Sequence, residues 1–305
     1  MSTATLSLAV ADGDGFLRRL ARRPLAIGSA VLLALLTGLA MLAPAIAGVA
    51  GIDPNAVDLL ARFEPPSAQH WLGTDDIGRD VLMRLLLGGQ VSLLVGMAAA
   101  LASALVGTAI GLAAGYWGGR LDALLMRLTD GVIALPLLPL LIVLAAVDLG
   151  KLGIPADWAD AQAVSLYRIV LIIALVGWTT VARLVRGAVL SVRTRDFVLA
   201  ATGQGAGPLR IMALHILPNV ASPIIVATTL SVGNVILLES VLSFLGLGIQ
   251  PPLPSWGNML TNAQELVTSA PWLAIWPGFL IFVTVIACNL LGDGLQDALD
   301  PRASE

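Results

Sequence analysis

Few side chains in this sequence have the types and spacing that catalysis or nucleotide binding requires. A phosphate-binding loop needs glycine, four residues and then Gly-Lys-Ser/Thr, but the only lysine, Lys151, is followed by Leu152. The hydrolase signatures Gly-x-Ser-x-Gly and His-Glu-x-x-His are also absent. The single cysteine, Cys288, can form no intrachain disulfide, and we interpret it as a packing residue. The sequence predicts no catalytic residue, no metal site and no cofactor bound by this chain.

Three carboxylates near the ends of apolar runs are the remaining candidates for ion or proton chemistry: Glu239, Asp130 and Asp293. An ionisable side chain within a membrane is a functional candidate by default. Near a helix end, however, a solvated or structural carboxylate is the better interpretation. We therefore expect no proton relay from these three residues.

The most informative feature is the polar segment from Arg183 to Pro218, which lies between two apolar runs and carries five arginines and one acid, Asp196. We predict that Asp196 caps a short helix beginning at Phe197. The glycine-rich run 203–207 then ends that helix, and Pro208 opens a second helix at the permitted first position. The segment is expected to form two short helices at an angle.

Small residues at the predicted bend, Ala200, Ala201 and Gly205, would let the surface of another protein approach the backbone. Pro218 would mark the return of the chain to the apolar region. As a bare pattern this spacing also fits an ordinary loop. Its length and its flanking apolar runs favour a docking site.

The elements that position this segment are membrane spans. The chain is 57% hydrophobic and 12% charged, whereas about a quarter of the residues in soluble domains are charged. A helix needs roughly 20 apolar residues to cross a hydrocarbon core of about 30 Å. The clearest runs are Pro24 to Gly51, Leu85 to Gly119, Gly131 to Val147, Ile211 to Leu238 and Leu266 to Gly292.

A sixth and shorter run, Ile169 to Ala182, spans only if Arg168 and Arg183 extend their charges towards the two interfaces. The prediction is an all-α polytopic membrane protein with about six transmembrane helices. The first run could also be a cleaved signal peptide, because Ala45-Ile46-Ala47 resembles a cleavage site. Its apolar stretch exceeds the usual core of about 7 to 15 residues, so we favour an uncleaved anchor.

Basic residues set the orientation of membrane proteins, because they accumulate on the cytoplasmic side. With six spans and the N-terminus inside, the inner segments hold twelve of the 17 lysines and arginines, and the opposite topology inverts this ratio. The inner residues are Arg18, Arg19, Arg22, Arg23, Arg120, Arg127, Arg183, Arg186, Arg193, Arg195, Arg210 and Arg302. The outer residues are Arg62, Arg79, Arg84, Lys151 and Arg168.

Two features predict how the helices pack. Gly107, Gly111 and Gly115 recur every four residues and would let a neighbouring helix approach closely, although glycine is also frequent in membrane helices generally. Pro136 and Pro139 remove backbone hydrogen bonds and should kink the third run.

The segment Phe197 to Asn219 resembles the cytoplasmic coupling loop of ABC importer permeases, written Glu-Ala-Ala, three residues, Gly, nine residues and Ile-x-Leu-Pro. Beyond that loop the chain is similar to the permease subunits of di- and oligopeptide ABC importers, specifically the subunit with a capped N-terminal region. The other matching segments are His70 to Asp80, Gly115 to Arg127, Glu239 to Asn258 and Leu290 to Arg302. The resemblance implies the type I ABC importer permease fold.

The resemblance also implies partners. These are a second homologous permease, two cytoplasmic ATPases that hold ATP and Mg, and an extracytoplasmic solute-binding protein in a bacterial or archaeal inner membrane. A net charge of −3 leaves no basic stripe for a nucleic acid. The implied cargo is short peptides, with nickel complexes, oligosaccharides and other peptide-like solutes as alternatives.

Site residues follow from the same resemblance. The residues expected to couple to the ATPases are Asp196, Leu199, Ala200, Ala201, Gly205, Pro208, Arg210, His215, Leu217 and Pro218. Those expected at an outer gate or a binding-protein contact are Glu239, Pro251, Pro252 and Trp256, for which simple loop closure is an equal alternative.

Two of these residues depart from the generic motif. Leu199 stands where the motif has glutamate, and His215 where it has isoleucine, so an acid-mediated contact cannot be assumed. His215 could titrate, but a packing residue with a hydrogen-bonded ring is the better interpretation.

The expected organisation is a cytoplasmic tail over residues 1–23, a first helix with an extracytoplasmic cap over 24–90, and a core permease domain over 91–305 that holds the coupling loop 183–219. Within the cap, residues 81–87 are expected to form a helix lying at the membrane interface. A self-contained channel or ion-coupled carrier is the alternative from another class. It would transport without an ATPase, and the lack of a convincing internal repeat weighs against it.

Overall fold

A computed structural model of the chain describes residues 13–148, 150–152, 162–261, 266 and 268–299. The regular elements are helices, and no strand occurs among these residues. They are α1 (Gly13–Ala21), α2 (Pro24–Ala50), α3 (Val81–Trp117), α4 (Gly119–Ala134), α5 (Leu137–Ala145), α7 (Gln162–Val192), α8 (Asp196–Gly203), α9 (Pro208–Ile211), α10 (Ala221–Phe244) and α12 (Trp272–Leu299). Short 3-10 turns cover Gly150–Leu152, Leu217–Val220 and Asn258–Leu260, and a π turn covers Met212–Ile216.

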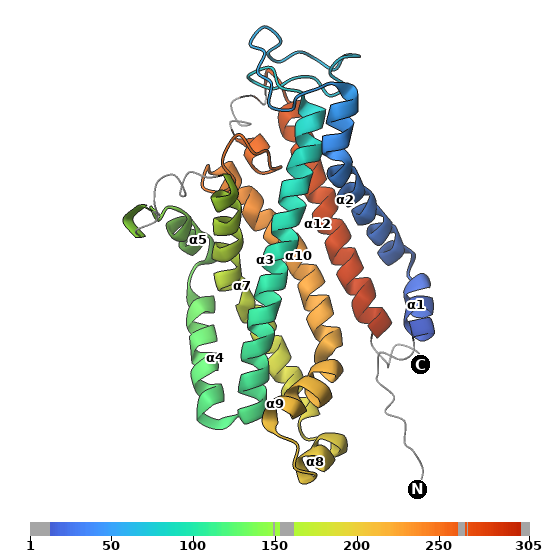
Figure 1. Cartoon of the computed structure of the whole chain (residues 1–305), viewed down its shortest axis with the longest axis vertical. Helices are drawn as coiled ribbons and strands as arrows, with labels where there is room; N and C mark the ends of the chain where they lie inside the picture. The colour runs from blue at the N-terminus through green and yellow to red at the C-terminus, as the bar shows by residue number, and fades with distance from the viewer. Residues whose placement is uncertain (1–12, 149, 153–161, 262–265, 267, 300–305) are drawn as a thin grey trace.

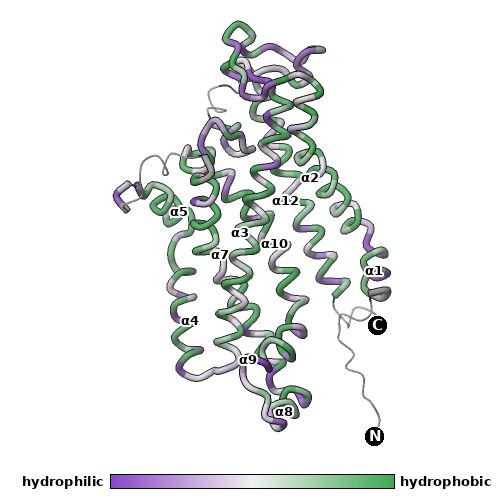
Figure 2. Tube along the Cα trace, viewed as in Figure 1, coloured by the Kyte–Doolittle hydropathy of each residue, from purple (hydrophilic) through white to green (hydrophobic). Residues whose placement is uncertain are grey.

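Five helical segments are long and apolar enough to cross a membrane: α2, α3, α7, the run Pro208–Phe244 and α12. The pair α4 and α5 passes the same test together, but it is bent by 87°. The prediction of an all-α polytopic protein with about six spans is therefore confirmed. Apolar residues dominate the long helices, and polar ones gather in the segment that joins α2 to α3 and around α8, at opposite ends of the bundle (Figures 1 and 2).

The third span differs from its predicted bounds of 131–147. Its first half is α4, which starts at Gly119, and the helix breaks at Leu135, whose backbone is extended before Pro136. A residue before proline disfavours the helical conformation, which explains the position of the break. The predicted kink is confirmed, but it is a sharp bend rather than a continuous bent span. The predicted short run 169–182 is also longer and forms part of α7.

The interfacial helix predicted for residues 81–87 is wrong, because these residues form the first turns of the continuous helix α3. Asp80 starts this helix, since its Oδ1 accepts a hydrogen bond from the backbone N–H of Met83 at 2.8 Å. Val81 and Leu85 are buried in the main core of the bundle. The boundary placed at residue 90 falls inside this helix.

The small residues of α3 pack against α7 as predicted. A Cβ atom built on Gly107 would lie 2.5 Å from the backbone oxygen of Trp178, and one on Gly111 would lie 2.7 Å from that of Ala182. A Cβ atom on Gly115 would meet Val189 at 2.7 Å. Because no larger side chain fits at these distances, the glycines allow α3 and α7 to pack with their backbones close together.

Candidate functional site

Helix α8 has a different start from the one predicted. The cap position is Arg195, which makes no side-chain cap hydrogen bond, and Asp196 is the first helical residue. The prediction that Asp196 caps the helix is therefore wrong. An acidic residue in the first turn still interacts favourably with the positive end of the helix dipole.

Gly205 ends α8 in a left-handed conformation with φ of 82°. The backbone N–H of Ala206 donates to the oxygen of Ala201 at 3.1 Å, and that of Gly205 donates to Thr202 at 2.9 Å. This pair of bonds is the Schellman motif, whose left-handed position is usually glycine and sometimes asparagine. A Cβ atom on Gly205 would meet nothing within 4 Å, so the bend faces open space.

After the bend, Pro208 occupies the first turn of α9 as predicted. The chain then continues through the π turn and a 3-10 turn that contains Leu217 and Pro218, and enters α10 without a loop. The main-chain oxygen of His215 accepts a hydrogen bond from the side chain of Asn219 at 2.7 Å. Among the described residues the His215 ring has no hydrogen-bond partner, so the prediction of a hydrogen-bonded ring at this position is wrong.

The tip of the bundle carries an exposed apolar surface. Leu209 is 75% exposed, Leu199 57% and Phe197 41%, and we call these three side chains the tip surface. Ala200 and Arg210 are exposed beside them. Phe197 and Leu199 flank the buried Val198 on α8, so the tip presents exposed apolar side chains on both sides of this helix, as expected of a segment that another protein covers. The sequence reasoning missed Phe197 and Leu209, although apolar residues in an otherwise polar segment were a usable signal.

The opposite face of the tip is anchored to α7. Val198 of α8, Ile211 of α9 and Ile216 of the π turn are at most 2% exposed and share a core cluster with Val185 and Val189 of α7. Ala201 is 9% exposed and belongs to the same buried side of α8. Buried apolar contacts therefore hold the tip surface to α7.

Ion pairs join α4 to α7 at the same end of the bundle. Asp122 receives two hydrogen bonds from Arg186, at 2.5 and 2.6 Å. Asp130 lies 2.5 Å from Arg183. The inner carboxylate Asp130 thus has a structural role, as expected, whereas the bidentate pair was not foreseen because the sequence does not show which charges meet.

At the other end of the bundle, the side chain of Trp256 packs against the surface of α3. Its indole is 2% exposed, and Nε1–H donates to the backbone oxygen of Leu85 at 3.0 Å. A Cβ atom on Gly89 would lie 2.9 Å from the indole ring, and one on Gly88 would lie 3.2 Å from the backbone of Ser255. The two glycines of α3 therefore form the recess that the tryptophan fills.

Glu239 lies at the centre of a hydrogen-bond network next to this recess. It is fully buried, and its carboxyl group accepts hydrogen bonds from Ser92 of α3 at 3.2 Å and Ser243 of α10 at 2.7 Å. The same hydroxyl oxygens accept the backbone N–H groups of Trp256 at 3.1 Å and Ile249 at 3.0 Å. Glu239 thus links the loop after α10 to α3 and α10 through the two serines. We call Glu239, Ser92, Ser243, Ile249 and Trp256 the outer clamp.

The four predicted outer residues divide into two groups. Glu239 and Trp256 are buried in the outer clamp, whereas Pro251 and Pro252 are exposed on the loop above it. Asn258 closes that loop, because its amide group donates to the backbone oxygen of Leu253 at 2.7 Å. Only the two prolines lie where a partner can reach them in this conformation.

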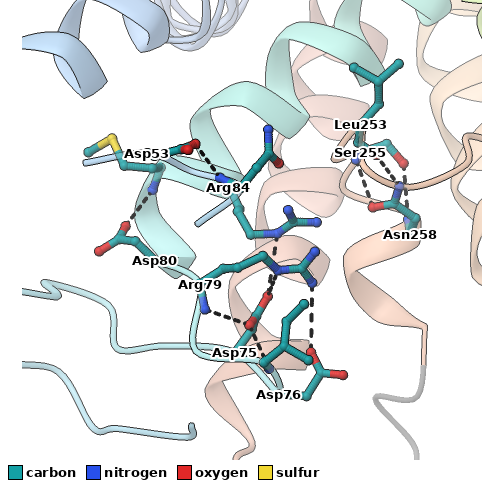
Figure 3. A network of polar contacts seen from close by, with 12 residues as sticks. Asp53, Asp75, Asp76, Arg79, Asp80, Arg84, Leu253, Ser255 and Asn258 are labelled. Atoms are coloured by element: carbon teal, nitrogen blue, oxygen red, sulfur yellow. Dashed lines mark hydrogen bonds and ion pairs between the residues drawn. The ribbon is translucent and has the colours of Figure 1, made fainter. Parts of the chain in front are cut away.

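Ion pairs and hydrogen bonds hold the segment between α2 and α3 in place (Figure 3). Asp75 accepts hydrogen bonds from the side chain and the backbone of Arg79, at 2.7 and 2.9 Å. It also lies 3.6 Å from Nε of the buried Arg84. His70 Nδ1 lies 2.9 Å from Asp80, which starts α3. These contacts fix residues 70–80 onto the first turn of α3, so that the segment forms a cap over the bundle.

Among the described residues, no group of three or more His, Cys, Asp or Glu side chains could hold a metal ion.

Residues 107–305 match the family described as "Binding-protein-dependent transport system inner membrane component", and residues 14–66 match "N-terminal TM domain of oligopeptide transport permease C". The chain belongs to this permease family.

The permease has curated relatives that match nearly its whole length. It is 39% identical over 285 residues to a dipeptide transport system permease protein of Alkalihalophilus pseudofirmus, which covers 93% of this chain and 88% of the relative. It is 40% identical over 289 residues to the dipeptide transport system permease protein of Bacillus subtilis, which covers 93% and 84%. An oligopeptide transport system permease protein of the same organism is 38% identical over 250 residues, or 82% and 77%.

The resemblance drawn from the sequence is thereby confirmed, and so is the helical permease fold. The permease is the multi-span membrane component of a binding-protein-dependent, inner-membrane transport system, and this family is not itself catalytic. The tip surface and the outer clamp lie at opposite ends of its bundle (Figure 1).

Proposed function

We propose that this permease forms half of the translocation path of an ATP-driven importer of short peptides. Cytoplasmic ATPases would dock on the tip surface, a second homologous permease would complete the path, and a solute-binding protein would deliver the cargo. The observation that carries this proposal is the tip surface itself, whose exposed apolar side chains stand on a rigid anchor to α7. Peptide cargo is supported by the printed names of the relatives.

The proposed mechanism is alternating access driven through α8. When ATP closes the ATPase dimer, the two tip surfaces of the permease pair move together. Val198 and Ile211 pass this motion to α7, and the ion pairs of Arg183 and Arg186 carry α4 with it. The close contact of Gly107 with α7 extends the moving unit to α3. The two permeases then open outward to receive cargo, and hydrolysis resets them.

The function can be tested by reconstituting the permease with and without its partners. We expect dipeptide uptake into proteoliposomes only when the second permease, both ATPases and the binding protein are present. The permease alone should hydrolyse no ATP, because its sequence lacks a phosphate-binding loop. ATP-independent uptake by the permease alone would instead support a channel or carrier. Uptake of nickel complexes or oligosaccharides but not of peptides would support the alternative cargoes.

The proposed topology places the tip surface and both termini in the cytoplasm. Single cysteines at the exposed Ser67 and Ser191, with Cys288 replaced, should react with a membrane-impermeant thiol reagent from opposite sides. Ser67→Cys should react in intact cells and Ser191→Cys only after permeabilisation. If both react in intact cells, ATPases cannot reach the tip surface, and the proposal fails.

A further inference from the structure

Two asparagines lie within membrane-spanning helices and face outward from the bundle. Asn234 of α10 and Asn289 of α12 are both exposed, although each is flanked by apolar residues. Among the described residues, neither side-chain amide has a hydrogen-bond partner. An amide without a partner is unfavourable in hydrocarbon, so lipid is the wrong environment for this pair.

The packing of α10 on α12 shows that the two asparagines share a face. A Cβ atom on Gly233 would lie 3.3 Å from Cβ of Cys288, and one on Gly292 would lie 2.5 Å from Leu230. As the residue number increases along α12, the residue number of its contact on α10 decreases. The two helices are therefore antiparallel (Figure 1). Asn234 and Asn289 each follow one residue after the facing pair Gly233 and Cys288. One residue turns a helix by about 100°, and because the helices are antiparallel the two turns run in opposite senses. Both amides therefore point to the same side of the helix pair, within about 3 Å of each other along the helix axes.

That side points away from α3. A Cβ atom on Gly96 of α3 would meet Ile236 at 2.6 Å and Val232 at 3.6 Å, so these residues mark the face of α10 that packs on α3. Asn234 lies midway between them in sequence and therefore projects from the opposite face of the helix. On the same outward faces, Leu237 of α10, which is 41% exposed, lies one turn from Asn234, and Phe282 of α12, which is 62% exposed, lies two turns from Asn289.

We propose that this face of α10 and α12 lines the cargo path, where Asn234 and Asn289 hydrogen-bond the backbone of a passing peptide. This assignment rests on the peptide importer proposed above. A side-chain amide has two N–H donors and an acceptor oxygen, so it complements the C=O and N–H groups that every peptide presents. It is uncharged, and the surrounding apolar side chains accept cargo side chains of different kinds. The pair would recognise the peptide backbone rather than a particular sequence.

The test uses the complete importer in proteoliposomes, with Cys288 replaced by alanine. Asn234→Cys and Asn289→Cys should react with a charged methanethiosulfonate reagent at least tenfold faster than Met97→Cys. Met97 is the matched control, because it is 50% exposed in α3 and follows Gly96, which packs against the same turn of α10. Transported alanyl-alanine should slow the reaction of both asparagine variants at least threefold.

Equal, slow reaction of all three cysteines would overturn the proposal. So would rapid reaction that appears only when detergent separates the two permeases, because the asparagines would then lie at the permease interface. Fast reaction that a transported dipeptide does not slow would overturn the assignment to cargo. As a functional check, Asn234→Leu with Asn289→Leu should reduce uptake at least tenfold while the subunits still copurify, and Asn234→Gln should retain more uptake than Asn234→Leu.

Failure of the inference can be distinguished from failure of the proposed function. If the unsubstituted importer takes up alanyl-alanine but the cysteines stay unreactive, only the assigned face is wrong. If it takes up no peptide, the peptide function is wrong, whatever the reactivity of the cysteines.

Discussion

Replacing Gly205 by arginine is expected to abolish transport while the permease still inserts and pairs with the second permease. Uptake should fall at least tenfold, because weakening the docking free energy or raising the transport barrier by only about 1.4 kcal/mol has that effect. Addition of loaded binding protein should no longer raise the ATP hydrolysis of the complex. The measurement is peptide uptake and ATP hydrolysis in proteoliposomes with matched amounts of each subunit.

Two physical effects act together in this variant. Gly205 has a φ of 82° within the Schellman motif, and a side chain there costs about 1 to 2 kcal/mol. The arginine side chain also enters the open space beside the tip surface, where a Cβ atom meets no atom of this chain within 4 Å. The membrane helices, which pack elsewhere, should be little affected. Gly205→Asn tolerates the left-handed backbone with a shorter side chain and should retain most uptake.

A matched control separates backbone strain from the loss of docking. Gly246 ends α10 with φ of 75° and the same two hydrogen bonds, from Leu247 to Leu242 and from Gly246 to Ser243. It also faces open space, but it lies at the outer end of the bundle. Gly246→Arg should therefore leave copurification of the ATPases intact. If Gly205→Arg keeps wild-type uptake and stimulation, the tip is not the coupling element.

Replacing Trp256 by alanine is expected to destabilise the permease more than any other change to the outer loop. Removing a fully buried aromatic side chain costs about 3 to 5 kcal/mol. Here the indole fills the recess over Gly89, and its N–H satisfies the oxygen of Leu85, so its loss leaves both a cavity and an unpaired carbonyl group. The thermal unfolding midpoint of the detergent-solubilised permease should fall clearly.

Trp256→Phe keeps much of the ring but loses the hydrogen bond, so its cost should be smaller, about 1 kcal/mol for the bond together with a partial loss of packing. Trp71→Ala is the matched control, because Trp71 is 71% exposed on the cap and its removal should change the midpoint little. Equal effects of Trp71→Ala and Trp256→Ala would mean that the outer clamp does not hold the loop to α3.

Helix α3 connects these two regions of the permease. Its outer end receives Trp256 and donates a hydrogen bond from Ser92 to Glu239, and its inner half packs on α7 through Gly107 and Gly111. A displacement that begins at the tip therefore has a continuous packed route to the outer clamp. The static structure provides the route, and the two variants above test its ends.

The sequence by itself determined the membrane class, the approximate number of spans and the position of the tip. Long uncharged runs can satisfy their backbone only as helices in lipid, so composition and length are sufficient for this step. Gly205 and Pro208 were also readable, because a left-handed helix end and a first helical turn select these residue types locally. The close packing expected of Gly107, Gly111 and Gly115 followed from their spacing.

Only the tertiary structure decided which of these features belong together. Asp196 fits a helix cap by type, yet Arg195 takes that position, because packing of Val198 on α7 helps to set where α8 lies. Glu239 and Trp256 appeared as surface candidates, but both are buried, and both are hydrogen-bonded to Ser92 of α3, more than a hundred residues earlier. Such contacts depend on which helix faces meet, and the apolar runs of a membrane protein show little periodicity from which those faces could be inferred. Local signals thus determined the elements, and long-range packing determined their roles.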